Sequence, residues 1–133
     1  MRVLVDTNIL VRISNGVEPE ASTALDSLNR LRGKGHEPCL VPQNHYEFWT
    51  VATRPIEVNG LGMSTAETEA ELARYSPPIF RLQGKVTHDT RLVAAMLRHG
   101  ISHLLTFNAA HFVRFKEITA LTPQEVLASS LGE

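Results

Sequence analysis

The stretch Met1-Arg-Val-Leu-Val-Asp-Thr-Asn8 opens the chain and decides which fold we expect. Its apolar, β-branched run from Val3 to Val5 shows no alternation, which is typical of a strand buried on both faces in a parallel sheet. Asp6 follows the run directly. A carboxylate at the exit of such a strand lies where open α/β sheets bind ligands. We therefore expect a functional site at this edge of the sheet.

Helical and strand patterns alternate along the rest of the chain. The residues from 55 to 63 have neither period and predict a loop, while Ser64 with Glu67 and Thr122 with Glu125 form capping boxes that begin helices. This alternation predicts one domain spanning residues 1–133, a three-layer α/β/α sandwich with a mostly parallel sheet of four to five strands. The expected strands are 3–5, 39–41, 79–82, 104–106 and an edge strand at 118–121; the expected helices are 7–14, 19–33, 42–53, 64 to the prolines at 77–78, 87–99, 109–114 and one from 122.

Composition restricts the kind of partner and the cellular location that we expect. The chain of 133 residues is 43% hydrophobic and carries a net charge of −1, so it is neither disordered nor globally basic. A nucleic-acid partner would need a local cluster of Arg and Lys, or metal ions. The single cysteine, Cys39, excludes an internal disulfide. No run approaches the ~18 apolar residues of a membrane span, and we expect a soluble, cytoplasmic protein.

Four polar residues stand at or just beyond the predicted strand ends: Asp6, Glu47, Asp89 and Asn108. The strands of a parallel sheet end at one shared edge, so residues far apart in sequence converge there. Each residue also has an ordinary explanation. Asp89 suits the helix macrodipole, a mid-helix Glu47 is commonly solvated, and Asn108 can cap a helix.

The facing of two helices supports convergence of these residues. Asp89 shares a helical stripe with the apolar Leu92, Val93 and Met96, and Glu47 lies on a comparable stripe. Carboxylates that share one cleft repel each other unless cations neutralise them. Oxygen ligands suit Mg²⁺ or Mn²⁺, and two such ions ~4 Å apart can promote phosphodiester cleavage.

Four stretches of the chain resemble the PIN-domain ribonucleases, specifically the VapC-type toxins of bacterial toxin–antitoxin pairs. The stretches are Val3-Leu-Val-Asp-Thr-Asn8, Asn44-His-Tyr-Glu-Phe-Trp49, His88-Asp-Thr-Arg-Leu-Val-Ala-Ala95 and Leu104-Leu-Thr-Phe-Asn-Ala-Ala-His-Phe112. The resemblance implies a PIN-like fold, with Asp6, Glu47 and Asp89 as acidic metal-binding residues and Asn108 at the fourth position. It also implies Mg²⁺- or Mn²⁺-dependent endoribonuclease activity, a homodimer and inhibition by a cognate VapB-type antitoxin.

The chain departs from the commonest family pattern at two positions. Many relatives carry Asp at the position of Asn108, and another acid at the position of His111. An amide oxygen can ligate Mg²⁺ but adds no negative charge, so we expect weak binding of a second ion.

Other polar and aromatic side chains near the predicted centre have proposed roles. Thr7 and Thr106 are placed to orient a carboxylate or a water, and Asn8 to hold the turn after Asp6. We expect Phe48 and Trp49 to serve core or dimer packing. A zinc site built on histidines is disfavoured because the histidine spacing does not place them on one helix face. The candidate phosphate contacts are Arg12, Arg54, Lys85, Arg91 and Lys116.

Two other functions compete with the metal-dependent ribonuclease. In an aspartyl-phosphate phosphatase the carboxylate after the first strand is the nucleophile, but such enzymes usually carry a second Asp two residues later, where this chain has Asn8. A non-catalytic or weakly active RNA-binding module of PIN fold would retain the cleft without efficient cleavage.

Overall fold

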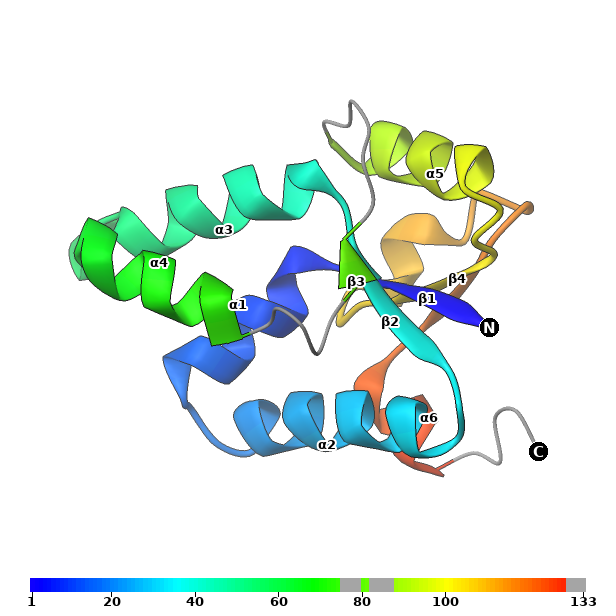
Figure 1. Cartoon of the computed structure of the whole chain (residues 1–133), viewed down its shortest axis with the longest axis horizontal. Coiled ribbons are helices and arrows are strands. Elements are labelled where there is room, and N and C mark those ends of the chain that lie inside the picture. Colours follow the sequence, from blue (N-terminus) through cyan, green and yellow to red (C-terminus); the bar gives the residue numbers. More distant parts are fainter. Residues whose placement is uncertain (75–79, 82–87, 129–133) are drawn as a thin grey trace.

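The structure, a computed structural model, describes residues 1–74, 80–81 and 88–128, and for residues 80–81 and 88–91 it describes the backbone only. Strands and helices alternate through these segments (Figure 1). The elements are β1 (Arg2–Val5), α1 (Thr7–Asn15), α2 (Glu20–Gly33), β2 (Glu37–Leu40), α3 (Pro42–Thr53), η1 (Ile56–Val58), α4 (Thr65–Arg74), β3 (Phe80–Arg81), α5 (His88–Arg98), β4 (His103–Leu105), η2 (Ala109–Phe112), β5 (Thr119–Leu121) and α6 (Pro123–Ala128).

The strands form one sheet in the order β3-β2-β1-β4-β5, and every neighbouring pair is parallel. β1 lies at the centre, as its unbroken apolar run predicts. β5 lies at an edge, as expected. Val3 and Val5 pack with the apolar faces of α1, α2 and α3, whereas Leu4 packs with residues of α5 on the opposite face. Figure 1 shows α2 and α5 on opposite sides of the sheet, so the predicted α/β/α sandwich is confirmed.

Several boundaries differ from the predicted ones. β2 begins at Glu37, two residues early, and includes Pro38. Proline lacks a backbone donor; among the described residues, Pro38 is paired with Val3 of β1, and the described pairing of β2 with β3 begins at Cys39. The predicted loop at 55–63 contains the short helix η1, and Thr106 follows β4 instead of ending it. The predicted strand ends at 79 and 82 and the predicted cap Thr87 lie outside the described residues.

The helix starts and the core follow from local chemistry. Both capping boxes form: Ser64 and Glu67 bond each other's backbone amides, and so do Thr122 and Glu125. Phe48 is fully buried, as predicted, but Trp49 is 37% exposed and is not part of the core. Among the described residues, no helix combines the length and apolar character that crossing a membrane requires.

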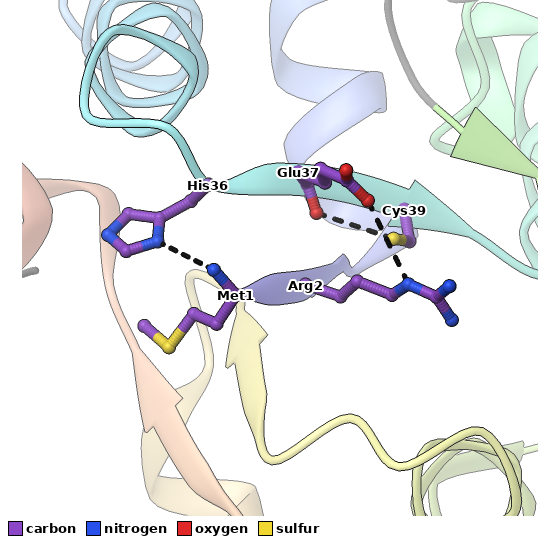
Figure 2. Close-up of polar contacts among 5 residues, drawn as sticks. All are labelled: Met1, Arg2, His36, Glu37 and Cys39. Atoms are coloured by element: carbon purple, nitrogen blue, oxygen red, sulfur yellow. Dashed lines mark hydrogen bonds and ion pairs between the residues drawn. The ribbon is translucent and has the colours of Figure 1, made fainter.

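The amino ends of β1 and β2 carry a separate set of polar contacts, on the sheet edge opposite the strand exits (Figure 2). The amino group of Met1 lies 3.2 Å from His36 Nδ1, and Arg2 Nε lies 3.8 Å from Glu37 Oε2. The Cys39 thiol donates to the carbonyl of Glu37 across 3.3 Å. The Met1–His36 and Arg2–Glu37 contacts join the two strands where they begin, whereas the Cys39 contact lies within β2.

Candidate metal centre

The loops after β1 and β4 leave the sheet at its topological switch point. The strand order runs outward from β1 to β2 and β3 on one side and to β4 and β5 on the other. Open α/β sheets bind ligands where neighbouring strands lead in opposite directions. Here the Asp6 amide donates to the Leu105 carbonyl at 2.8 Å, which continues the β1–β4 pairing to the strand ends. Asp6 and Thr106 are thereby held side by side.

A cleft of about 610 Å³ opens at this point and contains three of the four predicted site residues. Asp6 directly follows β1, Glu47 lies on α3, and Asn108 directly precedes η2. Its walls are Asp6, Thr7, Asn8, Val11, Arg12, Asn15, Glu47, Val51, Asn59, Gly60, Leu61 and Asn108.

The fourth predicted residue, Asp89, lies in the first turn of α5, and its side chain lies outside the described part of the structure. Further along α5, Leu92, Val93 and Met96 are buried, as the predicted stripe requires. The face of α5 that is buried is therefore the predicted one, whereas the role of Asp89 in the site stays a prediction.

The Thr106 hydroxyl fixes the Asp6 carboxylate. Thr106 Oγ1 donates to Asp6 Oδ2 at 2.8 Å. It accepts from Asn8 Nδ2 at 3.2 Å and from the backbone amide of Asn108 at 3.0 Å. One hydroxyl offers one donor and two acceptor positions, so this fully buried group is saturated. Asp6 caps α1 by position but makes no side-chain capping bond; its carboxylate is turned to Thr106.

A second network orients Glu47: it contains Thr7, which the sequence predicts as a residue that orients a carboxylate, and Asn44, for which the sequence predicts no such role. Thr7 Oγ1 donates to Glu47 Oε1 at 3.0 Å and accepts from Asn44 Nδ2 at 3.1 Å. Asn44 also donates to the Val5 carbonyl at 3.0 Å and accepts from the Val41 amide at 2.8 Å. Glu47 is half-buried and held by a hydrogen bond, which distinguishes it from a fully exposed surface residue. Asn44 stands between the polar residues Gln43 and His45 in the first turn of α3, so the local sequence did not mark its role.

Asn8 and Asn108 also have defined positions. Asn8 accepts from the Phe107 backbone amide at 3.3 Å while donating to Thr106, so it joins the start of α1 to the loop after β4; the prediction gave it only the local turn after Asp6. Asn108 precedes η2 but makes no side-chain capping bond to it. The helix-cap explanation of Asn108 is therefore wrong, and the residue lines the cleft instead.

Cationic and loop residues complete the walls. Arg12, on α1, lines the cleft and lies 5.9 Å from the centroid of the Phe107 ring. Arg54, at the end of α3, lines a neighbouring hollow. Gly60 brings the loop after η1 close to α3, because a Cβ there would overlap the backbone of Arg54. Of the other proposed phosphate contacts, Lys116 is exposed away from the cleft, whereas Lys85 and the Arg91 side chain lie outside the described residues.

The donor set of the cleft fits a hard cation. The described residues that line it include the carboxylates of Asp6 and Glu47, the Thr7 hydroxyl and four asparagine side chains, among them the predicted ligand Asn108; none of these described residues is His or Cys. Such oxygen donors suit Mg²⁺ or Mn²⁺ and do not suit zinc. In the described part of the chain, no three His, Cys, Asp or Glu side chains form a metal-binding group. Asp6 and Glu47 supply two acids, and Asp89 is the predicted third.

Comparisons with known proteins agree on the fold. No family model and no curated protein sequence matches the chain. Among solved structures, VapBC2 from Rickettsia felis, bound to a DNA fragment from its promoter, is similar with a TM-score of 0.58 and 12% sequence identity. The chain has the fold of that protein. The likeness covers 92% of this chain and 98% of the VapBC2 chain, so the PIN-like fold that the sequence predicts is confirmed. At this identity, the VapBC2 likeness concerns the fold, and the function is argued from the cleft.

Proposed function

We propose that this chain is a metal-dependent endoribonuclease that acts as the toxin of a VapBC-type pair. One observation carries the proposal: Asp6 and Glu47 meet in one cleft at the switch point of the sheet, each fixed by a threonine hydroxyl. Two fixed carboxylates gathered in one cleft are an arrangement that a divalent cation would stabilise. The fold, shared with a chain of a VapBC complex, supports the toxin assignment.

The residues of the cleft have distinct roles in this proposal. Asp6, Glu47 and Asp89 would hold Mg²⁺ or Mn²⁺, with Asn108 as a neutral fourth ligand. When bound, such ions supply Lewis-acid stabilisation of a phosphate and activation of a water. Thr106 and Thr7 hold the two described carboxylates in place, so little reorganisation is needed during the reaction. Arg12 provides positive charge in the wall for a substrate phosphate.

The phosphatase alternative loses support from the position of Asn8. In that class the residue two positions after the nucleophile is a second acid that transfers a proton. Here Asn8 Nδ2 and Oδ1 are both engaged between Thr106 and the Phe107 amide. Asn8 therefore serves to connect two loops, and an amide there has no proton to transfer at neutral pH.

The proposed partners are an RNA substrate, a cognate VapB-type antitoxin and a second copy of the chain in a homodimer, in the cytoplasm. VapBC2, whose fold this chain shares, was crystallised as a complex on promoter DNA. The exposed apolar residues Trp49, Ile56 and Val58 on α3 and η1 give surface that a protein partner could cover.

Cleavage of RNA by the wild-type chain and by Asp6→Asn, with and without Mg²⁺ or Mn²⁺, tests the function. We expect metal-dependent cleavage that falls by at least about 100-fold in a folded Asp6→Asn variant. Cleavage that survives both EDTA and the substitution would overturn the proposal. RNA binding without cleavage across a broad RNA pool would favour the non-catalytic module.

A further inference from the structure

A second hollow lies along α3, immediately beside the cleft. It has a volume of about 280 Å³ and shares Glu47 and Val51 with the wall of the cleft. Its residues recur at helical spacing on one face of α3: Gln43, Tyr46, Glu47, Thr50, Val51 and Arg54. A linear polymer bound at Asp6 and Glu47 can therefore continue into this α3 hollow without leaving the protein surface.

Three side chains of the α3 hollow offer different kinds of contact. Tyr46 is 72% exposed, which leaves most of its ring available for stacking. Arg54 provides a planar cation suited to phosphate. Gln43 is 94% buried, and its amide oxygen has no hydrogen-bond partner in the part of the chain that the structure describes. A buried acceptor that lacks a donor is unfavourable, so a ligand that provides one gains affinity.

We propose that the α3 hollow binds the nucleotide next to the scissile phosphate of single-stranded RNA. Tyr46 stacks on its base, Arg54 contacts a neighbouring phosphate, and Gln43 accepts a hydrogen bond from the ribose 2′-hydroxyl after rotation of its terminal amide. The location of the scissile phosphate rests on the function proposed above; the contacts to the flanking nucleotide do not.

The spacing along α3 fits this arrangement. Arg54 follows Glu47 by seven residues, or about 10 Å of helix at 1.5 Å per residue. That distance places Arg54 beyond the acidic centre, on a phosphate other than the one being cleaved. Arg12 lies on α1 within the cleft itself. Cationic side chains thus stand at two points along the path, as a polyanion requires in a chain of net charge −1.

The chemistry of the hollow favours RNA over a protein occupant. A protein interface would be expected to pair Tyr46 with apolar neighbours. Among the described residues that line the hollow with it, Gln43, Glu47, Thr50 and Arg54 are polar or charged and Val51 alone is apolar. The unpaired amide oxygen of Gln43 distinguishes RNA further, because a 2′-hydroxyl is the donor that RNA has and DNA lacks.

Fluorescence anisotropy with a labelled 12-nucleotide single-stranded RNA, and with DNA of the same sequence, tests the proposal in EDTA, where cleavage does not interfere. We expect Tyr46→Ala to weaken RNA binding at least about fivefold and Tyr46→Phe to leave it within about twofold, since the phenyl ring also stacks. Arg54→Ala should weaken RNA and DNA alike and lower the salt dependence by about one phosphate contact. Gln43→Met should reduce the preference for RNA over DNA.

Matched controls come from surfaces remote from the cleft. Arg32→Ala removes an exposed arginine of α2, and Val113→Ala shortens a side chain that is 75% exposed. Both should bind RNA like the wild type. Equal losses in the controls, no loss in Tyr46→Ala and Arg54→Ala, or no measurable RNA binding by the wild type would each overturn the proposal.

Two further measurements separate this proposal from the others. If the wild type cleaves RNA through Asp6 but Tyr46→Ala and Arg54→Ala change neither binding nor KM, nucleotide binding in the α3 hollow is refuted and the proposed ribonuclease function is retained. If the wild type does not cleave RNA but its RNA binding depends on Tyr46 and Arg54, the proposed ribonuclease function is refuted and nucleotide binding in the α3 hollow is retained. Size-exclusion chromatography tests whether α3 forms a dimer interface instead. If Tyr46→Ala converts a dimer to a monomer, α3 joins two copies of the chain, and the proposal of nucleotide binding in the hollow is overturned.

Discussion

Thr7 Oγ1 donates a hydrogen bond of 3.0 Å to Glu47 Oε1, although the two residues are 40 positions apart. Thr7 directly follows Asp6, so neighbouring residues at one strand end control two acids: Asp6 is itself in the cleft, and Thr7 orients Glu47. Asn44 donates to the same hydroxyl and to the Val5 carbonyl, which joins the start of α3 to the end of β1. The position of Glu47 in the cleft thus depends on a connection between a strand and a helix.

Thr7→Val tests this connection, because valine keeps the shape and removes the donor. We expect the apparent affinity for Mn²⁺, measured from metal-dependent RNA cleavage, to fall about 10- to 100-fold, as is usual when a residue that orients a metal ligand is lost. Thr7→Ser should restore most of it. Thr53→Val is a matched control, since the Thr53 hydroxyl bonds only its own helix at the Trp49 carbonyl. Equal metal affinity in Thr7→Val and wild type would contradict the role given to Thr7.

Thr106→Val should affect both stability and activity. It removes the hydroxyl that bonds Asp6, Asn8 and the Asn108 amide in a fully buried position. Buried polar groups left without partners cost about 1–3 kcal/mol, and we expect a loss of that order in the free energy of unfolding, measured with urea. Thr106→Ser should recover it. A Thr106→Val variant as stable as the wild type would show that water replaces the hydroxyl.

Removal of the metal should be visible in thermal unfolding. The proposed Mg²⁺ or Mn²⁺ would bind the folded cleft and not the unfolded chain, so we expect the metal at 100 times its dissociation constant to stabilise the wild type by about 2.7 kcal/mol. Asp6→Asn should abolish this shift in melting temperature, and it should unfold no earlier than the wild type in EDTA, because one of two neighbouring negative charges is gone. A metal-induced shift of equal size in both proteins would place the ion elsewhere.

Cys39 should be unreactive in the folded protein. Its thiol is fully buried in β2, and burial raises the pKa of Cys39 to about 11, an effect that nearby Glu37 reinforces and Arg2 opposes. We expect iodoacetamide at pH 8 to modify it far more slowly in buffer than in urea.

The raised pKa of Cys39 also links the stability of the fold to pH. The folded state retains the thiol proton above the ordinary thiol pKa of 9.0, where the unfolded chain loses it, so this contribution to stability is complete below pH 9 and is lost as pH rises toward 11. Cys39→Ala lacks the thiol, so its unfolding free energy should decline less steeply over the same range. Parallel declines in the two proteins would contradict the assignment.

Much of the fold could be predicted because its signals are local. The apolar run at β1, the capping boxes and the glycine and proline stops each act within a few residues, and they predict the alternating order. The gathering of Asp6, Glu47 and Asn108 followed from the shared edge of parallel strands. Local patterns did not reveal the extension of β2 across Pro38, since that depends on which of its sides is paired.

The details of the site depended on tertiary contacts that no local pattern encodes. The roles of Asn44 and of the loop at Gly60 arise from packing between α3 and its neighbours. Trp49 was assigned to core or dimer packing from its residue type, but the register of α3 turns Phe48 inward and leaves Trp49 at the surface. Sequence spacing indicates which residues can share a face, whereas burial depends on what packs against that face.

The hydrogen bond between Thr106 and Asp6 joins residues separated by 100 positions. During translation, Asp6, Thr7 and Glu47 leave the ribosome well before Thr106 and before strand β5, which pairs with β4. A nascent chain therefore carries the acidic residues but lacks the hydroxyl that fixes Asp6. Any activity of this centre should thus begin only after Thr106 and β5 have been synthesised and have joined β1 and β4.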